Sequence, residues 1–438
     1  MSRQETYDDE IDRREYRRAR RKRNQLIAII VVIVAGLALV AGGIFGVTRL
    51  MKHLNDKKHT EELQAQLEEL AESEPAVVEA PEEEPQELTS DDYLNQIADT
   101  CIAEMSLENK VAGLFMITPE SLTGVDTVIQ AGDTTKQKLS EYPVGGLIYF
   151  SKNIKSADRL KEMLDTTRNT MIYPVFLAVD EEGGSVSRVA GAGLAENVGD
   201  MSEIGSTCDP EKAKEVGTTI GTYLSQSGFN VDFAPVADVV SAENAVIGNR
   251  SFGSDPNVVG TMVAAEVQGL QESGVSACLK HFPGIGDTTT DTHDEKTVSE
   301  KTLEDMQQND LPAFQAGIDA GADFVMVSHM SLPNVVGDDT PCSLSGTVIS
   351  DLLRNQLGYD GIVITDALDM SAITDSYSSA EAAVKAIEAG ADMLLMPENF
   401  EEAYQGVLEA VQNGTISEER INESLKRIYR VKYRDRIE

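Results

Sequence analysis

Short apolar runs rich in β-branched residues recur along the chain, and their spacing constrains the fold more than any other feature of the sequence. The runs cover Gly113–Ile117, Gly145–Phe150, Pro174–Val179, Val231–Val236, Ser276–Phe282, Asp323–His329, Gly361–Thr365 and Asp392–Met396. Strands that are apolar throughout are typical of a parallel sheet covered by helices. Eight such runs predict an α/β fold, a (β/α)8 TIM-like barrel, in a domain that spans residues 93–438.

Amphipathic stretches separate the apolar runs and carry the signals that begin and end helices. One begins at Ser156, and another has Pro210 near its start and Gly228 at its end. Neither a GxGxxG loop nor a GxxxxGK[ST] loop follows the first apolar run, which argues against a dinucleotide or nucleoside triphosphate site. The alternation of strand and helix favours the barrel over an open doubly wound sheet.

An uncharged run, Leu26–Val47, precedes the predicted barrel and is long enough to cross a bilayer, which requires about 20 residues. Because the core of a secretory signal peptide has only ~7–15 residues, we expect an uncleaved transmembrane helix at 26–47, with cleavage as the alternative. The basic segment Arg13–Arg23 should keep the tail, residues 1–25, in the cytoplasm. The sequence thus predicts a single-pass protein of the cell membrane whose barrel lies outside the cytoplasm.

Residues 48–92 are expected to form an acidic stalk between the membrane and the barrel. The stretch Glu61–Asp92 is rich in Glu and Pro and has few aromatic residues. Such a composition cannot bury enough apolar surface to fold compactly, so we interpret the segment as a solvated spacer.

The charge and the cysteines of the chain limit its partners. Acidic residues outnumber basic residues 74 to 37, and a net charge of -37 argues against a nucleic-acid partner. The four cysteines lie far apart and form no CxxC pair, so they predict neither a zinc site nor a disulfide framework. The strongly negative charge of the chain favours a neutral or cationic partner.

Ionisable residues follow five successive apolar runs, from the third to the seventh. They are Asp180, Asp238, Lys280 with His281, His329 and Asp366. Because the carboxyl ends of barrel strands meet at one rim, we expect these side chains to converge there. Carboxylates, imidazoles and a lysine, together with Arg250 of "GNRSFG", suit a neutral ligand rich in hydroxyl groups, such as a sugar.

Six motifs, in this order, give the chain a specific resemblance to a known family. They are "LENKVAGLFMI", "AVDEEGGSVSR", "NVDFAPVADV", "GNRSFG", "KHFPGIGDTTTDTH" and "GIVITDALDM". The chain resembles the barrel of glycoside hydrolase family 3, specifically its β-N-acetylhexosaminidase branch, from Leu107 to Arg430. The resemblance implies a retaining exo-β-N-acetylhexosaminidase that hydrolyses terminal β-linked N-acetylglucosamine from glycans derived from the cell wall or similar to chitin.

The resemblance also implies roles for individual residues. The nucleophile falls on Asp366, which would attack the anomeric carbon and form a covalent glycosyl-enzyme. Asp369, close by, is expected to be structural. The residues expected to bind the sugar are Asp180, Arg188, Arg250, Lys280 and His281.

The proton donor is expected on the loop after the fifth apolar run. The resemblance assigns the general acid/base to His293, paired with Asp291. An imidazole with an unperturbed pKa of about 6.5 can donate and accept a proton near neutral pH, and a nearby carboxylate would orient it. Because the chain ends at Glu438, soon after the eighth helical unit, we expect no second domain to supply the acid.

Several alternatives remain open for this loop and for the function. His281, Asp291 and His293 could instead bind a metal ion, or the loop could be a plain surface turn. Two positions depart from the family pattern, which has histidine at Ile285 and arginine at Ser185, and either could change the sugar that is accepted. A β-glucosidase or β-xylosidase, a phosphorolytic enzyme and a non-catalytic, membrane-tethered glycan-binding protein are the competing functions. The expected chemistry requires neither a metal nor an organic cofactor.

Overall fold

The structure is a computed structural model and describes residues 89–240, 246–288 and 296–434. Its central sheet has eight parallel strands in the order β10-β1-β2-β3-β6-β7-β8-β9. They are β1 (Phe115–Ile117), β2 (Gly146–Ile148), β3 (Phe176–Val179), β6 (Val231–Asp232), β7 (Ser276–Phe282), β8 (Phe324–Val327), β9 (Ile362–Thr365) and β10 (Leu394–Leu395). A parallel bridge between Ile364 and Met393 joins β9 to the start of β10, so the sheet closes into a ring. Each strand overlaps one of the predicted apolar runs.

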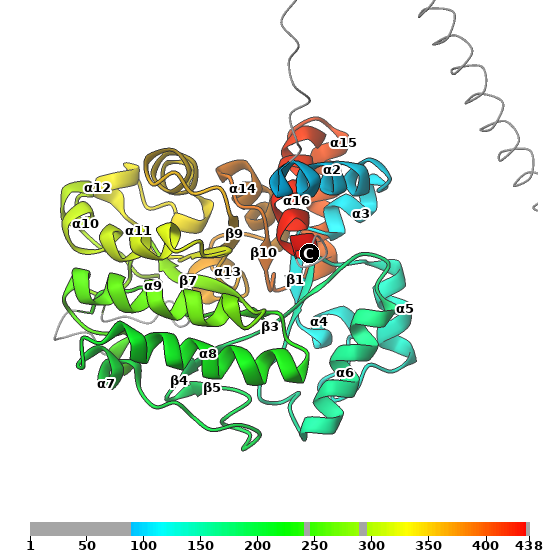
Figure 1. Cartoon of the computed structure of the whole chain (residues 1–438). Helices are drawn as coiled ribbons and strands as arrows, with labels where there is room; N and C mark the ends of the chain where they lie inside the picture. The colour runs from blue at the N-terminus through cyan, green and yellow to red at the C-terminus, as the bar shows by residue number, and fades with distance from the viewer. Residues whose placement is uncertain (1–88, 241–245, 289–295, 435–438) are drawn as a thin grey trace, which may run out of the picture. The chain divides into compact units, whose positions relative to one another are not determined.

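Helices surround the ring of strands (Figure 1). The longer ones are α2 (Ser90–Ala103), α5 (Asp133–Glu141), α6 (Ala157–Thr170), α8 (Pro210–Ser227), α9 (Pro256–Glu272), α11 (Leu311–Asp319), the π-helix η3 (Thr347–Gln356), α14 (Ser379–Ala389), α15 (Phe400–Gln412) and α16 (Glu418–Tyr433). The shorter ones are α3 (Leu107–Ala112), α4 (Pro119–Thr123), α7 (Met201–Gly205), η1 (Gly248–Arg250), α10 (Leu303–Asn309), α12 (Pro333–Val336), η2 (Cys342–Leu344) and α13 (Ser371–Thr374). A two-stranded antiparallel hairpin, β4 (Glu181–Gly183) and β5 (Val186–Ser187), follows β3.

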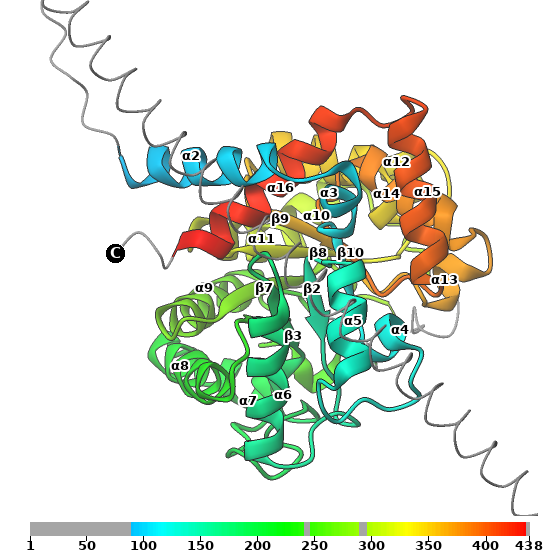
Figure 2. The ribbon, with the colours of Figure 1, turned by 90° about the vertical axis from the view of Figure 1, so that its right-hand side faces the viewer.

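The helix signals of the sequence act where they were predicted. Ser156 caps α6 by accepting a hydrogen bond from the backbone of Arg159. Pro210 occupies the first turn of α8, and Gly228 ends this helix with a φ of 107°, which a residue with a Cβ rarely adopts. Figures 1 and 2 show α8 and α9 packed side by side on one flank of the barrel.

Aromatic side chains fill the interior of the barrel at its amino-terminal end. Phe176 of β3 and Phe324 of β8 meet edge to face, with ring centroids 5.0 Å apart. These strands are not neighbours in the sheet, so the two rings meet across the interior. Lys432 of α16 closes this end: its Nζ lies 4.7 Å from the Phe176 ring centroid and donates to the carbonyl of Gly145 at 2.8 Å.

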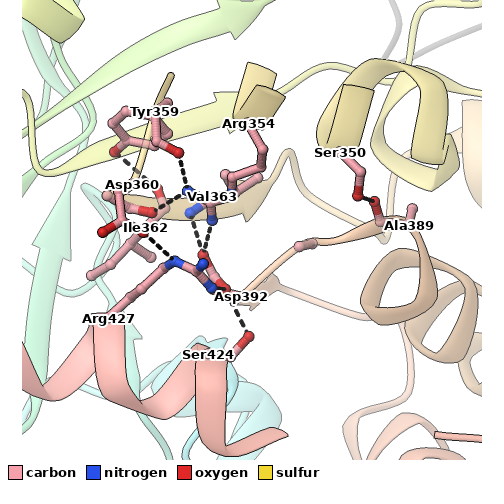
Figure 3. Close-up of polar contacts among 12 residues, drawn as sticks. Ser350, Arg354, Tyr359, Asp360, Ile362, Val363, Ala389, Asp392, Ser424 and Arg427 are labelled. Carbon is pink, nitrogen blue, oxygen red and sulfur yellow. Dashed lines mark hydrogen bonds and ion pairs between the residues drawn. The ribbon is translucent and has the colours of Figure 1, made fainter. Parts of the chain in front are cut away.

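A buried carboxylate fixes the last helix to the same end of the barrel (Figure 3). Asp392, fully buried before β10, accepts hydrogen bonds from the backbone N–H of Val363 at 2.9 Å and from Ser424 Oγ at 2.7 Å. The guanidinium of Arg354 in η3 donates to the same carboxylate, and that of Arg427 in α16 lies at 3.3 Å. One side chain therefore ties η3, β9 and α16 together.

The first and the last of the described helices, α2 and α16, lie side by side in both views (Figures 1 and 2). Thr89 caps α2 through a reciprocal pair of hydrogen bonds with Asp92. Lys426 of α16 pairs with Asp99 of α2 at 3.0 Å. The two ends of the described barrel unit are therefore held together.

The predicted fold class requires a correction, because it included a membrane-spanning helix. The residues that the structure describes contain no helix that is both long and apolar enough to cross a membrane. The longest of them, α8, has 18 residues and includes Glu211, Lys212, Lys214 and Glu215. Of the predicted fold class, the structure supports the α/β barrel-like parallel sheet. It does not support the transmembrane helix or the acidic stalk. The predicted tail, the run at 26–47 and the stalk up to residue 88 lie outside the described residues, and the cellular location stays a prediction.

Candidate active site

A cavity of about 400 Å³ opens at the carboxyl ends of the barrel strands. All of the predicted sugar-binding residues and the predicted nucleophile line it: Asp180, Arg188, Arg250, Lys280, His281 and Asp366. Asp369 lines the same cavity. The structure thus brings together six predicted site residues that are spread over almost 190 positions of the chain. Their individual roles stay predictions.

A larger cavity, of about 530 Å³, lies at the opposite end of the barrel, before β8 and β9. Three arginines of the C-terminal region, Arg427, Arg430 and Arg434, line it together with Asp91, Asp323 and Asp360. Ion pairs join Arg427 to Asp360 at 3.1 Å, Arg430 to Asp91 at 3.4 Å and Arg434 to Asp323 at 2.6 Å. None of the predicted site residues that the structure describes lines this cavity, so the smaller cavity is the candidate active site.

A chain of alternating charges forms one wall of the active-site cavity. Arg250 donates to Glu182 through two nitrogens, at 2.7 and 2.8 Å, and Lys280 Nζ lies 2.5 Å from the same carboxylate. Lys280 also donates to Asp180 at 2.8 Å, and Asp180 lies 3.9 Å from Arg188. Such charge-assisted contacts hold the side chains in fixed positions before a ligand arrives.

The pKa shifts of Glu182 and Lys280 favour the charged form of both side chains. Burial alone would raise the pKa of Glu182, but Lys280 and Arg250 outweigh it and lower this pKa to about 2. Burial would also lower the pKa of Lys280, but Asp180 and Glu182 outweigh it and raise this pKa above its usual range. The wall therefore offers a ligand fixed positive and negative groups over the whole neutral range.

Glu182 is a member of the site that the sequence analysis missed. The neighbouring glutamate, Glu181, has a different role, because it accepts backbone hydrogen bonds from Arg188, Val189 and Ala190 at 2.7 to 2.9 Å. Tyr223 donates to it as well, at 2.9 Å. Glu181 thereby shapes the turn that carries Arg188, whereas Glu182 holds Arg250 and Lys280. The alternation of side chains along an extended segment places Glu182, and not Glu181, on the same side as Asp180, and this signal could have identified it.

Asp238 is the second residue with a role in the site that the sequence analysis did not assign. It is fully buried and accepts hydrogen bonds from His281 Nδ1 at 2.8 Å, from the His281 backbone at 3.1 Å and from the Ile285 backbone at 2.8 Å. Because a carboxylate can only accept, His281 Nδ1 carries the hydrogen, and Nε2 is the acceptor of the neutral ring.

The two positions that depart from the family pattern do not line the cavity. Ile285 is buried, with 4% of its surface exposed, and belongs to the hydrophobic core. Ser185 is exposed between β4 and β5. Neither side chain is placed to contact a sugar in this cavity.

Asp366 lies directly after β9, and its backbone is tied to the neighbouring strand. Its N–H donates to the carbonyl of Val327 at 2.8 Å. Its Oδ1 accepts a hydrogen bond from the N–H of Ala367, also at 2.8 Å. The residue is half-buried, which is compatible with its predicted role as nucleophile.

The predicted acid/base pair, His293 and Asp291, lies outside the described residues. The alternative metal site, formed by His281, Asp291 and His293, shares Asp291 and His293 with this pair. Within 89–240, 246–288 and 296–434, no group of three or more His, Cys, Asp or Glu side chains could hold a metal ion. The acid/base pair, the metal site and the plain surface turn therefore all stay predictions for this loop.

A buried acid stands behind the charged wall, on α9. Glu266 is 1% exposed, and neither of its carboxylate oxygens has a hydrogen-bond partner among the described residues. Burial, with a smaller effect of Glu182, raises the pKa of Glu266 from its ordinary 4.5 to about 8. The unfolded side chain loses its proton above about pH 4.5, whereas the folded one holds it up to about pH 8. Its contribution to stability is therefore fully present below pH 4.5 and is lost as the pH rises from there through 8.

Replacing Glu266 by glutamine should therefore stabilise the protein increasingly as the pH rises from about 4.5 to about 8. At pH 4 Glu266 is mostly neutral in the folded and the unfolded state, and the melting temperatures should agree closely. Between pH 5 and 8 the melting temperature of Glu266→Gln should rise progressively above that of the unchanged protein, and the difference should level off above pH 8, because the variant has no carboxyl group that loses its proton on unfolding. Thermal unfolding at several pH values measures this, with Glu272→Gln near the end of α9 as the control. A difference that does not change with pH would contradict the assignment.

Comparison with known proteins tests the predicted family. The family model described as "Glycosyl hydrolase family 3 N terminal domain" matches residues 106–431. A β-hexosaminidase of Stenotrophomonas maltophilia (strain R551-3) is 36% identical over 273 residues, which are 60% of this chain and 80% of that protein. "Beta-hexosaminidase A" of Pseudoalteromonas piscicida is 32% identical over 323 residues, which are 67% of this chain and 54% of that protein. This chain thus spans only about half the length of the second relative.

Solved structures of the same family have the same fold. The family 3 β-N-acetylglucosaminidase of Paenibacillus sp. str. FPU-7 superposes with a TM-score of 0.70 and 35% identity, over 76% of this chain and 63% of that one. A family 3 glycosyl hydrolase of Mycobacterium smegmatis superposes with a TM-score of 0.67 and 32% identity, over 75% of this chain and 98% of that one. The predicted family is confirmed: the chain belongs to glycosyl hydrolase family 3.

Proposed function

We propose that the protein is a retaining exo-β-N-acetylglucosaminidase that removes terminal β-linked N-acetylglucosamine from glycans derived from the cell wall or similar to chitin. One observation carries the proposal: Asp366 lies in the same cavity as five charged or polar side chains suited to sugar hydroxyls. The β-hexosaminidases among the relatives and the β-N-acetylglucosaminidase among the solved structures support the choice of sugar.

The proposed reaction has two steps. In the first, an oxygen of Asp366 attacks the anomeric carbon, the bond to the aglycone breaks, and His293 gives its proton to the leaving oxygen. In the second, His293 takes a proton from water, the water oxygen attacks the anomeric carbon, and Asp366 leaves. Two inversions retain the β configuration. The role of Asp291 is to orient His293 and to stabilise its charged form.

The cavity suits a single terminal sugar. Its volume of about 400 Å³ is near the lower end of the roughly 300–1,000 Å³ that is common for ligand sites. Lys280, Arg250 and Arg188 provide donors, and Asp180 and His281 Nε2 provide acceptors, so hydroxyl groups on several sides of a ring can be bound. Phe150 and Met370 add apolar surface to the same lining.

A panel of chromogenic aryl β-glycosides tests the proposal on the full chain. We expect kcat/KM for the N-acetylglucosaminide to exceed that for the glucoside and the xyloside by about 100-fold or more, because a site built to bind a polar substituent leaves its own groups unpaired when that substituent is missing. Magnetic resonance of the first product should show the β anomer. Faster release from the glucoside or xyloside, release that depends on phosphate, or no release from any of the three would each overturn the proposal.

A further inference from the structure

We infer that His329 is a positioning residue that holds the backbone at Asp366 in its reactive place. The inference rests on the proposed function, because it assumes that Asp366 is the group that reacts. His329 follows β8 and lies outside the cavity lining, so it is not placed to touch the sugar itself.

The contacts of the imidazole are well defined. His329 is fully buried. Its Nε2 lies 2.8 Å from the carbonyl oxygen of Ala367, and its Nδ1 lies 2.7 Å from Ser343 Oγ. Because a carbonyl oxygen only accepts hydrogen bonds, Nε2 must carry a hydrogen. In the neutral ring, Nδ1 then accepts from the hydroxyl group of Ser343, which belongs to η2.

The backbone of Ala367 links His329 to the carboxylate of Asp366. The N–H of Ala367 donates to Asp366 Oδ1 at 2.8 Å, and the carbonyl of Ala367 accepts from His329. The next residue, Leu368, donates to the carbonyl of Leu395 at 2.9 Å. The contacts with His329 and Leu395 both fix the peptide unit between Ala367 and Leu368, directly after the Ala367 Cα. They thereby limit how far the preceding peptide, whose N–H meets the carboxylate, can turn about that Cα.

This arrangement matters because the reaction requires precise placement of one oxygen. A nucleophile has to lie about 3–3.5 Å from the anomeric carbon and in line with the breaking bond, and a displacement of about 1 Å can cost about 100-fold in rate. Without the imidazole, the peptide after Ala367 keeps only the Leu368 contact and can tilt, and the preceding peptide, whose N–H meets Asp366, can turn with it. Sugar binding, which depends on other residues, should change little.

Two substitutions at one position separate this role from a general packing role. The same number of bonds separates Nε2 from Cβ in glutamine and in histidine, so the side chain of His329→Gln can still donate to the carbonyl of Ala367. In asparagine, the polar atoms reach only as far as Nδ1 of histidine, so His329→Asn can still contact Ser343 but not Ala367. We expect His329→Asn to lower kcat by about 100-fold with KM changed by less than about twofold, and His329→Gln to lose less than about 10-fold in kcat.

The measurement is steady-state hydrolysis of the aryl glycoside that the unchanged protein cleaves best, at a temperature well below the melting temperature of each variant. Ser343→Ala serves as the second variant if His329→Asn does not fold: it keeps the contact to Ala367, and kcat should fall by less than about 10-fold. Equal kcat in the asparagine and glutamine variants, or a loss that appears in KM and not in kcat, would overturn the inference. A loss of about 100-fold in His329→Gln or in Ser343→Ala would overturn it as well.

Failure of the inference can be distinguished from failure of the proposed function. If the unchanged protein cleaves no aryl glycoside, or if Asp366→Ala is fully active, the proposed function itself is wrong. If Asp366→Ala is inactive and His329→Asn is as active as the unchanged protein, only the role of His329 is wrong.

Discussion

Replacing Asp366 by alanine is expected to lower the hydrolysis of an aryl β-N-acetylglucosaminide by about 10⁴-fold or more, because removing the nucleophile of a covalent mechanism eliminates the lowest-energy route. The variant should fold normally, since Asp366 is half-buried and lines an open cavity. Steady-state rates measured beside thermal unfolding separate lost chemistry from lost structure.

Added azide provides a sharper criterion for the same variant. A small anion can enter the space left by the carboxylate and attack the anomeric carbon from the same side, with release of the aryl group. The product should then be the α-configured glycosyl azide, formed by a single inversion. Asp369→Ala is the control, because Asp369 lines the same cavity and is not expected to attack. If Asp369→Ala, and not Asp366→Ala, lost activity and gave the azide product, the nucleophile would have been assigned to the wrong aspartate.

Replacing Asp392 by asparagine is expected to cause the largest loss of stability, about 3–5 kcal/mol in the free energy of unfolding. The buried carboxylate accepts from the guanidinium groups of Arg354 and Arg427, from Ser424 and from the backbone of Val363 (Figure 3). The neutral amide would leave the arginines without their buried counter-charge, and its NH₂ group would face other donors. Urea denaturation of the unchanged and variant proteins measures the difference.

Asp360→Asn is the matched control for this experiment. Asp360 pairs with Arg427 at 3.1 Å, and its side chain is 71% exposed. Exposed ion pairs are screened by solvent, so this variant should lose less than about 1 kcal/mol. Similar losses in the two variants would show that burial does not set the contribution of Asp392.

The sequence predicted the parallel strands because their physical cause is local. A strand covered by helices must be apolar along its whole length, and runs such as Phe176–Val179 satisfy this condition in the sequence itself. Convergence of the site followed from the same geometry, since Asp180, Lys280 and Asp366 come directly after or at the end of strands. Closure of the sheet then brings these three positions to one cavity.

Partners across long sequence distances could not be predicted in the same way. Glu181 and Glu182 are identical neighbours, yet one shapes a turn and the other holds Arg250. His329 was noted at the end of a strand, but its contact with Ala367 depends on how two separate loops meet. The predicted membrane helix shows a different limit: hydropathy alone predicted it, and no helix of the described residues supports it.

Closure of the ring has a consequence for synthesis of the protein. β1 pairs with β10, so a strand from the beginning of the barrel completes its hydrogen bonds only with a strand from near its end. While the chain is being made, β1 has an unpaired edge until Leu394 and Leu395 have left the ribosome. Long-range pairing of this kind is slow, and an unpaired edge can join another chain. Molecules stopped before β10 should therefore be prone to aggregation, and a cell that makes this protein has to protect an open barrel for most of its translation.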